Sequence, residues 1–129
     1  MHVILSAIIL ILAVFDLVIG TGFLVNPVVS GADFGLVADD ARGSSTLRAD
    51  MTAFFYVTFI SMAWGGWRRR GDVLLPALGL FGIALIGRTI NLVVVGPYEG
   101  WFVPMGVEAL HVIVMLIAMA VWRRPRRQA

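Results

Sequence analysis

The sequence contains four long apolar segments, residues 3–25, 47–67, 73–95 and 101–122, which are separated by more polar stretches. A helix needs about 20 consecutive apolar residues to cross the roughly 30 Å hydrocarbon core of a bilayer, and each segment reaches that length. The pattern therefore predicts an all-α integral membrane protein. We expect its four transmembrane helices to form an up-down-up-down bundle.

The composition is that of a membrane protein. Hydrophobic residues make up 60% of the chain and its mean hydropathy is +0.93, whereas soluble domains have roughly 45–50% apolar residues. The length of 129 residues fits a single domain, residues 1–129. The chain has no cysteine, which excludes disulfide exchange and thiolate catalysis. All ten basic residues are arginines, and their runs are short and flank the apolar segments, so we expect no nucleic-acid binding.

The arginines also predict an orientation, because cytoplasmic loops of membrane proteins carry an excess of positive charge. Three arginines lie at 68–70 and four lie in the tail, residues 123–129, which we expect to be mobile. Both termini should therefore be cytoplasmic, and the segments 26–46 and 96–100 should face outward. The expected location is the bacterial cytoplasmic (inner) membrane.

The segment 26–46 is expected to be an external loop. Asn26-Pro27 should end the first span, since proline disfavours helical geometry in the residue before it. The first span is too long for a signal-peptide core and is expected to be retained. A short interfacial turn is expected at residues 34–37, and one of the hydroxyl residues 44–46 should cap the second helix.

Ionisable residues inside the apolar segments fall at a shared depth. With the expected orientation and a rise of about 1.5 Å per residue, they all lie in the outer half of the membrane. Ionisable groups in a bilayer are costly unless they are paired, so a shared depth predicts one joint site. The residues expected to bind a ligand there are Asp16, Asp50, Arg88, Asn91, Glu108 and His111.

Pairings within this layer follow from spacing and charge. Asp16 and Arg88 are expected to form a structural ion pair, with Arg48 reaching the headgroups. Glu108 and His111 are three residues apart, so they share a helix face and are the candidates for acid and base catalysis. The acidic residues of the layer outnumber its arginines by one, which motivates the hypothesis that Glu108 and His111 share a proton.

No metal or cofactor is predicted. The spacing of Glu108 and His111 occurs in di-iron helical bundles, but that class needs the motif on two helices and this chain has it once. His2 lies at the far end of the predicted bundle, which argues against a haem held by two histidines. Nucleotide-binding motifs, Gly-x-Ser-x-Gly and His-Glu-x-x-His are absent from the sequence. A quinone or a lipid is the cofactor-like molecule that the site could hold.

Four short motifs are distributed over nearly the whole chain: Asn26-Pro27, Leu47-Arg48-Ala49-Asp50, Gly87-Arg88 and Glu108. Together they resemble the DoxX-like group of small four-helix bacterial membrane proteins, in particular a branch catalogued as a domain of unknown function. The resemblance implies an integral four-helix fold, and some relatives are linked to quinone-dependent oxidoreductase complexes. Family members place small glycines after the arginine–acid pair, where this chain has Met51-Thr52-Ala53.

Three functions follow from the predicted polar layer. The leading expectation is a binding or accessory protein, whose outward-opening pocket holds a small amphipathic ligand (a lipid or a quinone) or a helix of a membrane-protein partner. The second is an enzyme that uses Glu108 and His111 on a lipophilic substrate, with Arg88 holding an anionic or carbonyl group. The third is a proton-coupled transporter subunit that works as a homo-oligomer. A purely structural role in the bilayer is the remaining alternative.

Overall fold

The computed structural model describes residues 1–122, and these are helical almost throughout, with no strand among them. The long helices are α1 (His2–Val25), α4 (Thr52–Arg68), α5 (Leu75–Val94) and α6 (Phe102–Val121). The expected all-α class is confirmed for this part of the chain. The expected mobile tail, residues 123–129, lies outside the described residues.

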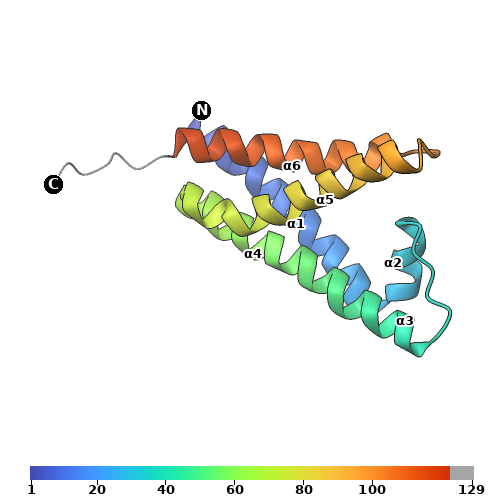
Figure 1. Cartoon of the computed structure of the whole chain (residues 1–129). Coiled ribbons are helices and arrows are strands. Elements are labelled where there is room, and N and C mark those ends of the chain that lie inside the picture. The colour runs from blue at the N-terminus through green and yellow to red at the C-terminus, as the bar shows by residue number, and fades with distance from the viewer. Residues whose placement is uncertain (123–129) are drawn as a thin grey trace.

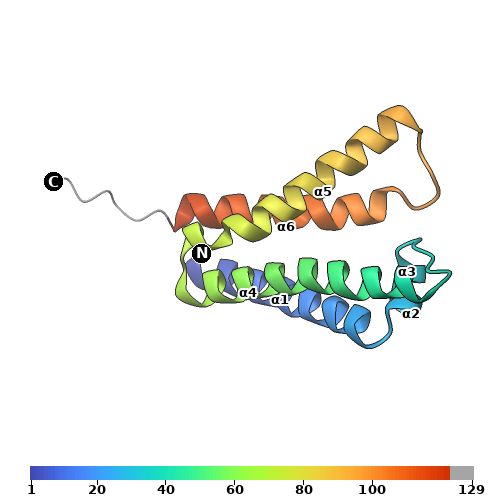
Figure 2. The same cartoon turned by 60° about the horizontal axis from the view of Figure 1, so that its bottom comes forward.

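The long helices form two pairs, α1 with α4 and α5 with α6 (Figure 1). The pairs meet near the N-terminus and diverge toward the opposite end (Figures 1 and 2). That opposite end carries two short helices, α2 (Pro27–Asp33) and α3 (Ala41–Thr46), and the connection between α5 and α6. We call it the loop end, and we call the end where the pairs meet the closed end.

Three helical segments of the described chain, His2–Val25, Gly71–Val94 and Phe102–Val121, are long and apolar enough to cross a membrane. Many large apolar side chains on them point outward, as expected for helices that face lipid. This indicates a membrane protein. The second predicted span is different, because α4 alone has 17 residues, fewer than the roughly 20 that a crossing needs.

The segment between α1 and α4 contains more helix than expected. Asn26 ends α1, and its side-chain oxygen accepts the Val29 N–H at 3.3 Å at the start of α2. Pro27 occupies the first turn of α2, where a backbone N–H would have no partner within the helix, so its missing N–H costs no hydrogen bond. The turn expected at residues 34–37 is present at residues 34–35, directly after α2, where Gly35 adopts a φ of +70°.

The start of the second long helical stretch was predicted wrongly. Asp40, rather than a residue of 44–46, is the cap, and its Oδ1 accepts the Gly43 N–H at 2.7 Å. The helix therefore begins at Ala41 instead of residue 47. From there α3 continues without a break through a π-helical turn, η1 (Leu47–Met51), into α4.

The apolar core lies toward the closed end, and all four long helices contribute to it. Its packing is close: a Cβ on Gly66 of α4 would lie 3.0 Å from Cγ2 of Ile9 in α1. This core joins the two helix pairs at the closed end, and the pairs diverge from it toward the loop end. The buried members are Leu5, Ile9, Ala13, Met62, Leu74, Ala77, Phe81, Val114, Met115, Ala118 and Trp122.

The turn between α4 and α5 is held by specific polar contacts. A 3₁₀ helix, η2 (Gly71–Leu74), leads directly into α5. Ser61 of α4 donates its hydroxyl to the carbonyl oxygen of Val73 at 2.6 Å. Arg70 forms an ion pair with Asp72, and this hydrogen bond and charge raise the pKa of Arg70. Arg70 therefore stays charged at every physiological pH, as a topological signal requires.

We expect Gly71→Ala to lower the free energy of unfolding by about 1–2 kcal/mol. A Cβ at this position would lie 2.8 Å from Cα of Met119, so the backbone of α6 would have to move. Gly79→Ala is the matched control, because a Cβ there has nothing within 4 Å. Unfolding in mixed detergent micelles measures both variants, and equal midpoints would contradict the close packing of η2 on α6.

Candidate ligand-binding site

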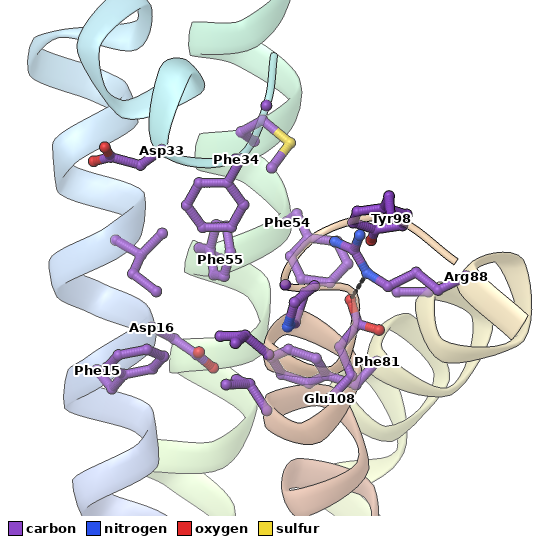
Figure 3. Close-up of a pocket in the computed structure, with 18 of the residues that line it drawn as sticks. Phe15, Asp16, Asp33, Phe34, Phe54, Phe55, Phe81, Arg88, Tyr98 and Glu108 are labelled. Atoms are coloured by element: carbon purple, nitrogen blue, oxygen red, sulfur yellow. Dashed lines mark hydrogen bonds and ion pairs between the residues drawn. The ribbon is translucent and has the colours of Figure 1, made fainter. Parts of the chain in front are cut away.

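A cavity of about 740 Å³ lies between the diverging helix pairs (Figure 3). All four long helices line it, together with residues 33–35 and 98–100 from the connections at the loop end. The volume falls within the roughly 300–1,000 Å³ typical of small-molecule sites. Most of the wall is apolar, and aromatic side chains are prominent in it: Phe15, Phe34, Phe54, Phe55, Phe81 and Tyr98.

An ion pair between α5 and α6 forms one wall of the cavity. Nε of Arg88 donates to Oε1 of Glu108 at 2.7 Å (Figure 3). The Glu108 side chain is 9% exposed and that of Arg88 is 36% exposed, so the carboxylate is enclosed while the guanidinium reaches outward beside Tyr98. Within residues 1–122, the second carboxylate oxygen of Glu108 accepts no hydrogen bond.

A second polar pair lies deeper, between α1 and α6. Asp16 lines the cavity, and His111 lies behind it with Nε2 at 3.4 Å from Oδ1 of Asp16. Both side chains are 0% exposed. The His111 ring stacks on Phe81 with ring centroids 4.1 Å apart, and its Nδ1 is 2.8 Å from the carbonyl oxygen of Val107. The ring orientation is therefore fixed by a backbone contact and an aromatic contact.

The backbone contact assigns the proton on the His111 ring. A carbonyl oxygen only accepts, so Nδ1 donates to Val107 and carries a hydrogen. In the neutral ring Nε2 then turns a lone pair toward the Asp16 carboxylate, which places two acceptors face to face. A proton between Nε2 of His111 and Oδ1 of Asp16 would turn this contact into a hydrogen bond.

The structure brings four of the six expected ligand-binding residues together, with different partners from those expected. Asp16, Arg88 and Glu108 line the cavity, and His111 lies directly behind Asp16. Asp16 contacts His111 rather than Arg88, because α6 lies between α1 and the arginine-bearing part of α5. Glu108 and His111 share a face of α6, but each contacts its own partner instead of the other.

The other two expected residues, Asp50 and Asn91, are exposed and lie outside the cavity lining. Asp50 falls in η1, and a π turn contains more residues than an α turn, so spacing counted along a regular helix misplaces it. Met51 lines the cavity instead. The buried residues of α5, Ala77 and Phe81, lie in its first half. Asn91 lies in the second half, where α5 diverges from the other helices.

Arg48 caps α1 instead of joining the predicted structural ion pair. Its Nε donates to the carbonyl oxygen of Leu24 at 3.0 Å, in the last turn of α1, where carbonyls lack a partner within the helix. A cation at this position also interacts favourably with the helix dipole. Thr52 makes a similar contact one turn earlier, donating its hydroxyl to the carbonyl oxygen of Gly20 at 3.3 Å.

We expect Arg48→Met to lower the free energy of unfolding by about 1 kcal/mol, because the C-terminus of α1 loses a charged donor. The loss should be local. Hydrogen exchange should therefore speed up for amides in the last turn of α1 and stay unchanged near Met62 in the core. Arg42→Met, which removes an exposed arginine from α3, is the control. Equal exchange in the two variants would contradict a capping role.

The aromatic wall was not predicted from the sequence, because the expected binding residues were chosen among polar side chains. A signal was present: Phe15 directly precedes Asp16, and Phe54 and Phe55 lie one turn after the charged start of the second apolar segment. Aromatic residues at the same depth along the helices as the charged residues are the sequence pattern that indicates such a pocket. The acidic residues at its rim, Asp33 and Glu99, belong to the connections and were not considered either.

Comparison of the chain with models of protein families, with curated proteins and with solved structures finds no match. The function is therefore argued from the geometry and charge of the cavity.

Proposed function

We propose that this protein is a multi-pass protein of the bacterial inner membrane that binds small amphipathic molecules in the cavity between its helix pairs. The observation that carries the proposal is an open cavity of about 740 Å³ that combines apolar aromatic walls with a partly buried ion pair, Arg88–Glu108, and the buried Asp16 backed by His111. The apolar part of an amphipathic ligand can pack on these walls while the charged side chains orient its polar head. Membership of the DoxX-like group is part of the same proposal and rests on the short motifs of the sequence.

The proposed topology has four membrane crossings. The π turn η1 (5 residues) continues into α4 (17 residues), and together they extend about 33 Å at 1.5 Å per residue. Trp64 and Trp67, 53% and 75% exposed near the end of α4, suit an interfacial position beside the arginine-rich turn. Both termini are then cytoplasmic and the cavity opens on the outer side.

The burial of the candidate catalytic residues favours binding over catalysis. His111 is not part of the cavity lining, and its Nδ1 is engaged by the backbone. Glu108 is held by Arg88. Proton-coupled transport is the second candidate, because Asp16 and His111 place two ionisable side chains in contact inside the bundle. The apolar core at the closed end separates that pair from the other side of the protein, so transport requires a rearrangement or a second copy.

Native mass spectrometry of protein extracted in a mild detergent tests the binding function. We expect the wild-type protein to retain a molecule of a few hundred daltons, and we expect Ala84→Trp, which fills the cavity, to lose it. Val93→Trp is the matched control on the same helix, because Val93 is 83% exposed and lies outside the lining. Equal retention by both variants, or an empty wild-type protein, would contradict the proposal.

Reporter fusions test the topology separately. A fluorescent protein fused to the C-terminus should fluoresce, and alkaline phosphatase at the same position should be inactive. The reverse result would place the cavity mouth on the cytoplasmic side.

A further inference from the structure

We infer that the ligand of this cavity is a lipophilic cation, such as an amphipathic amine or a quaternary ammonium or phosphonium compound. The inference rests on the proposed binding function and narrows its ligand class. Three independent features of the wall support it: its charge, its unsatisfied carboxylate oxygens and its aromatic rings.

The charge of the cavity lining is predominantly negative. The basic residue in it, Arg88, is engaged by Glu108. Two further acidic side chains, Asp33 and Glu99, lie exposed at the mouth. Asp16 adds a carboxyl group in the interior. Acidic residues therefore outnumber the basic residue of the lining, which attracts cations to the mouth and repels anionic amphiphiles.

Buried carboxylate oxygens in the cavity lack donors. Within residues 1–122, neither oxygen of Asp16 accepts a hydrogen bond, and the same is true of the second oxygen of Glu108. An enclosed acceptor without a donor is unfavourable, and a carboxylate without a full counter-charge is more so. These oxygens have almost no exposed surface, so a ligand acts on them through its charge: a cation in the cavity offsets their negative charge, whereas an anion adds to it.

Aromatic rings surround the same space. Phe15, adjacent to Asp16 in α1, lines one side, and Phe54 of α4 and Phe81 of α5 line others (Figure 3). The face of an aromatic ring is electron-rich and attracts a cation within about 6 Å of its centroid. Rings combined with a carboxylate thus match a cation that also has an apolar body. A simple metal ion would gain little from this wall, which is mostly carbon.

Two probes of similar shape and opposite charge test the inference, tetraphenylphosphonium and tetraphenylborate. Equilibrium dialysis against full-length protein in zwitterionic detergent measures their affinities. We expect the cation to bind at least about tenfold more tightly than the anion. Asp16→Asn should weaken binding of the cation by about tenfold, because it removes the interior charge while keeping the shape.

Variants at the mouth of the cavity separate a loss of cation binding from a loss of folding. Asp33→Asn and Glu99→Gln change exposed residues, so folding should be unaffected. We expect each to weaken binding of the cation about two- to threefold, because solvent screens these charges. Asp50→Asn is the matched control, since it removes an exposed acidic residue that does not line the cavity.

The outcomes separate the two proposals. Equal binding of both ions, or tighter binding of the anion, that is lost in Ala84→Trp would overturn the cationic ligand and leave the binding cavity in place. Failure of both ions to bind would count against the cavity as a binding site and against the cationic ligand together. An effect of Asp50→Asn as large as that of Asp16→Asn would also overturn the inference, because a general surface charge would then explain it.

Discussion

His111→Phe should lower the free energy of unfolding by about 3–4 kcal/mol, the largest effect expected in this protein. The substituted ring can keep the stacking contact with Phe81, so packing changes little. What is lost is the partner of Asp16, whose carboxyl group is 0% exposed. A buried carboxyl group without a partner must either remain charged in an apolar environment or take up a proton, and both are unfavourable.

Two further variants identify the cause of that loss. Asp16→Asn should cost less than about 1 kcal/mol, because its amide can donate to the lone pair on Nε2 of His111 while Nδ1 stays bonded to Val107. The double variant Asp16→Leu/His111→Phe should recover most of the stability lost in His111→Phe. Unfolding in mixed micelles with increasing sodium dodecyl sulfate gives all three values. A double variant less stable than His111→Phe would rule out this pair as the origin of the effect.

Arg88→Met should lower the free energy of unfolding by about 2–3 kcal/mol. This variant removes the donor from Oε1 of Glu108 and leaves the carboxylate enclosed without its counter-charge. The value is below that expected for a fully buried pair, because Arg88 is 36% exposed and solvent or lipid headgroups already screen it.

The companion variant Arg88→Met/Glu108→Met tests whether charge or packing is responsible. Replacing both members with apolar side chains of similar length should restore stability to within about 1 kcal/mol of the wild-type protein. The single variant Glu108→Met completes a double-mutant cycle, which gives the coupling energy. If Arg88→Met leaves the unfolding midpoint unchanged, the pair contributes nothing to stability and the wall does not depend on it.

Depth along the helices was predictable from the sequence, whereas partners were not. Asp16, Arg88 and Glu108 all reach one cavity, as a rise of about 1.5 Å per residue implies for charges equally far from the loop end. The pairing of these side chains depends on how the helices are arranged around the bundle and on how far they diverge. The hydropathy pattern of the sequence predicts neither. Asp50 shows the same limit locally, because a single π turn in η1 is enough to change the direction of a side chain.

The boundaries of the helices were predicted well where proline or glycine ends a segment and poorly where a side chain caps it. Asn26-Pro27 ends α1 as expected. Asp40 starts α3 well before the apolar stretch, and hydropathy alone could not show this because the first turns of that helix are polar. The cavity itself was the least predictable feature, because its volume depends on the angle between two helix pairs rather than on any local pattern.

The concentration of packing at the closed end has a mechanical consequence. The two helix pairs are joined at one end, by η2 and the core around it. With 20 residues α5 is about 30 Å long. A rotation of α5 by about 5° about its packed end would therefore displace its other end by roughly 2.6 Å. Little core packing is disturbed by such a pivot. A pivot of this kind would change the width of the cavity while leaving the closed end in place.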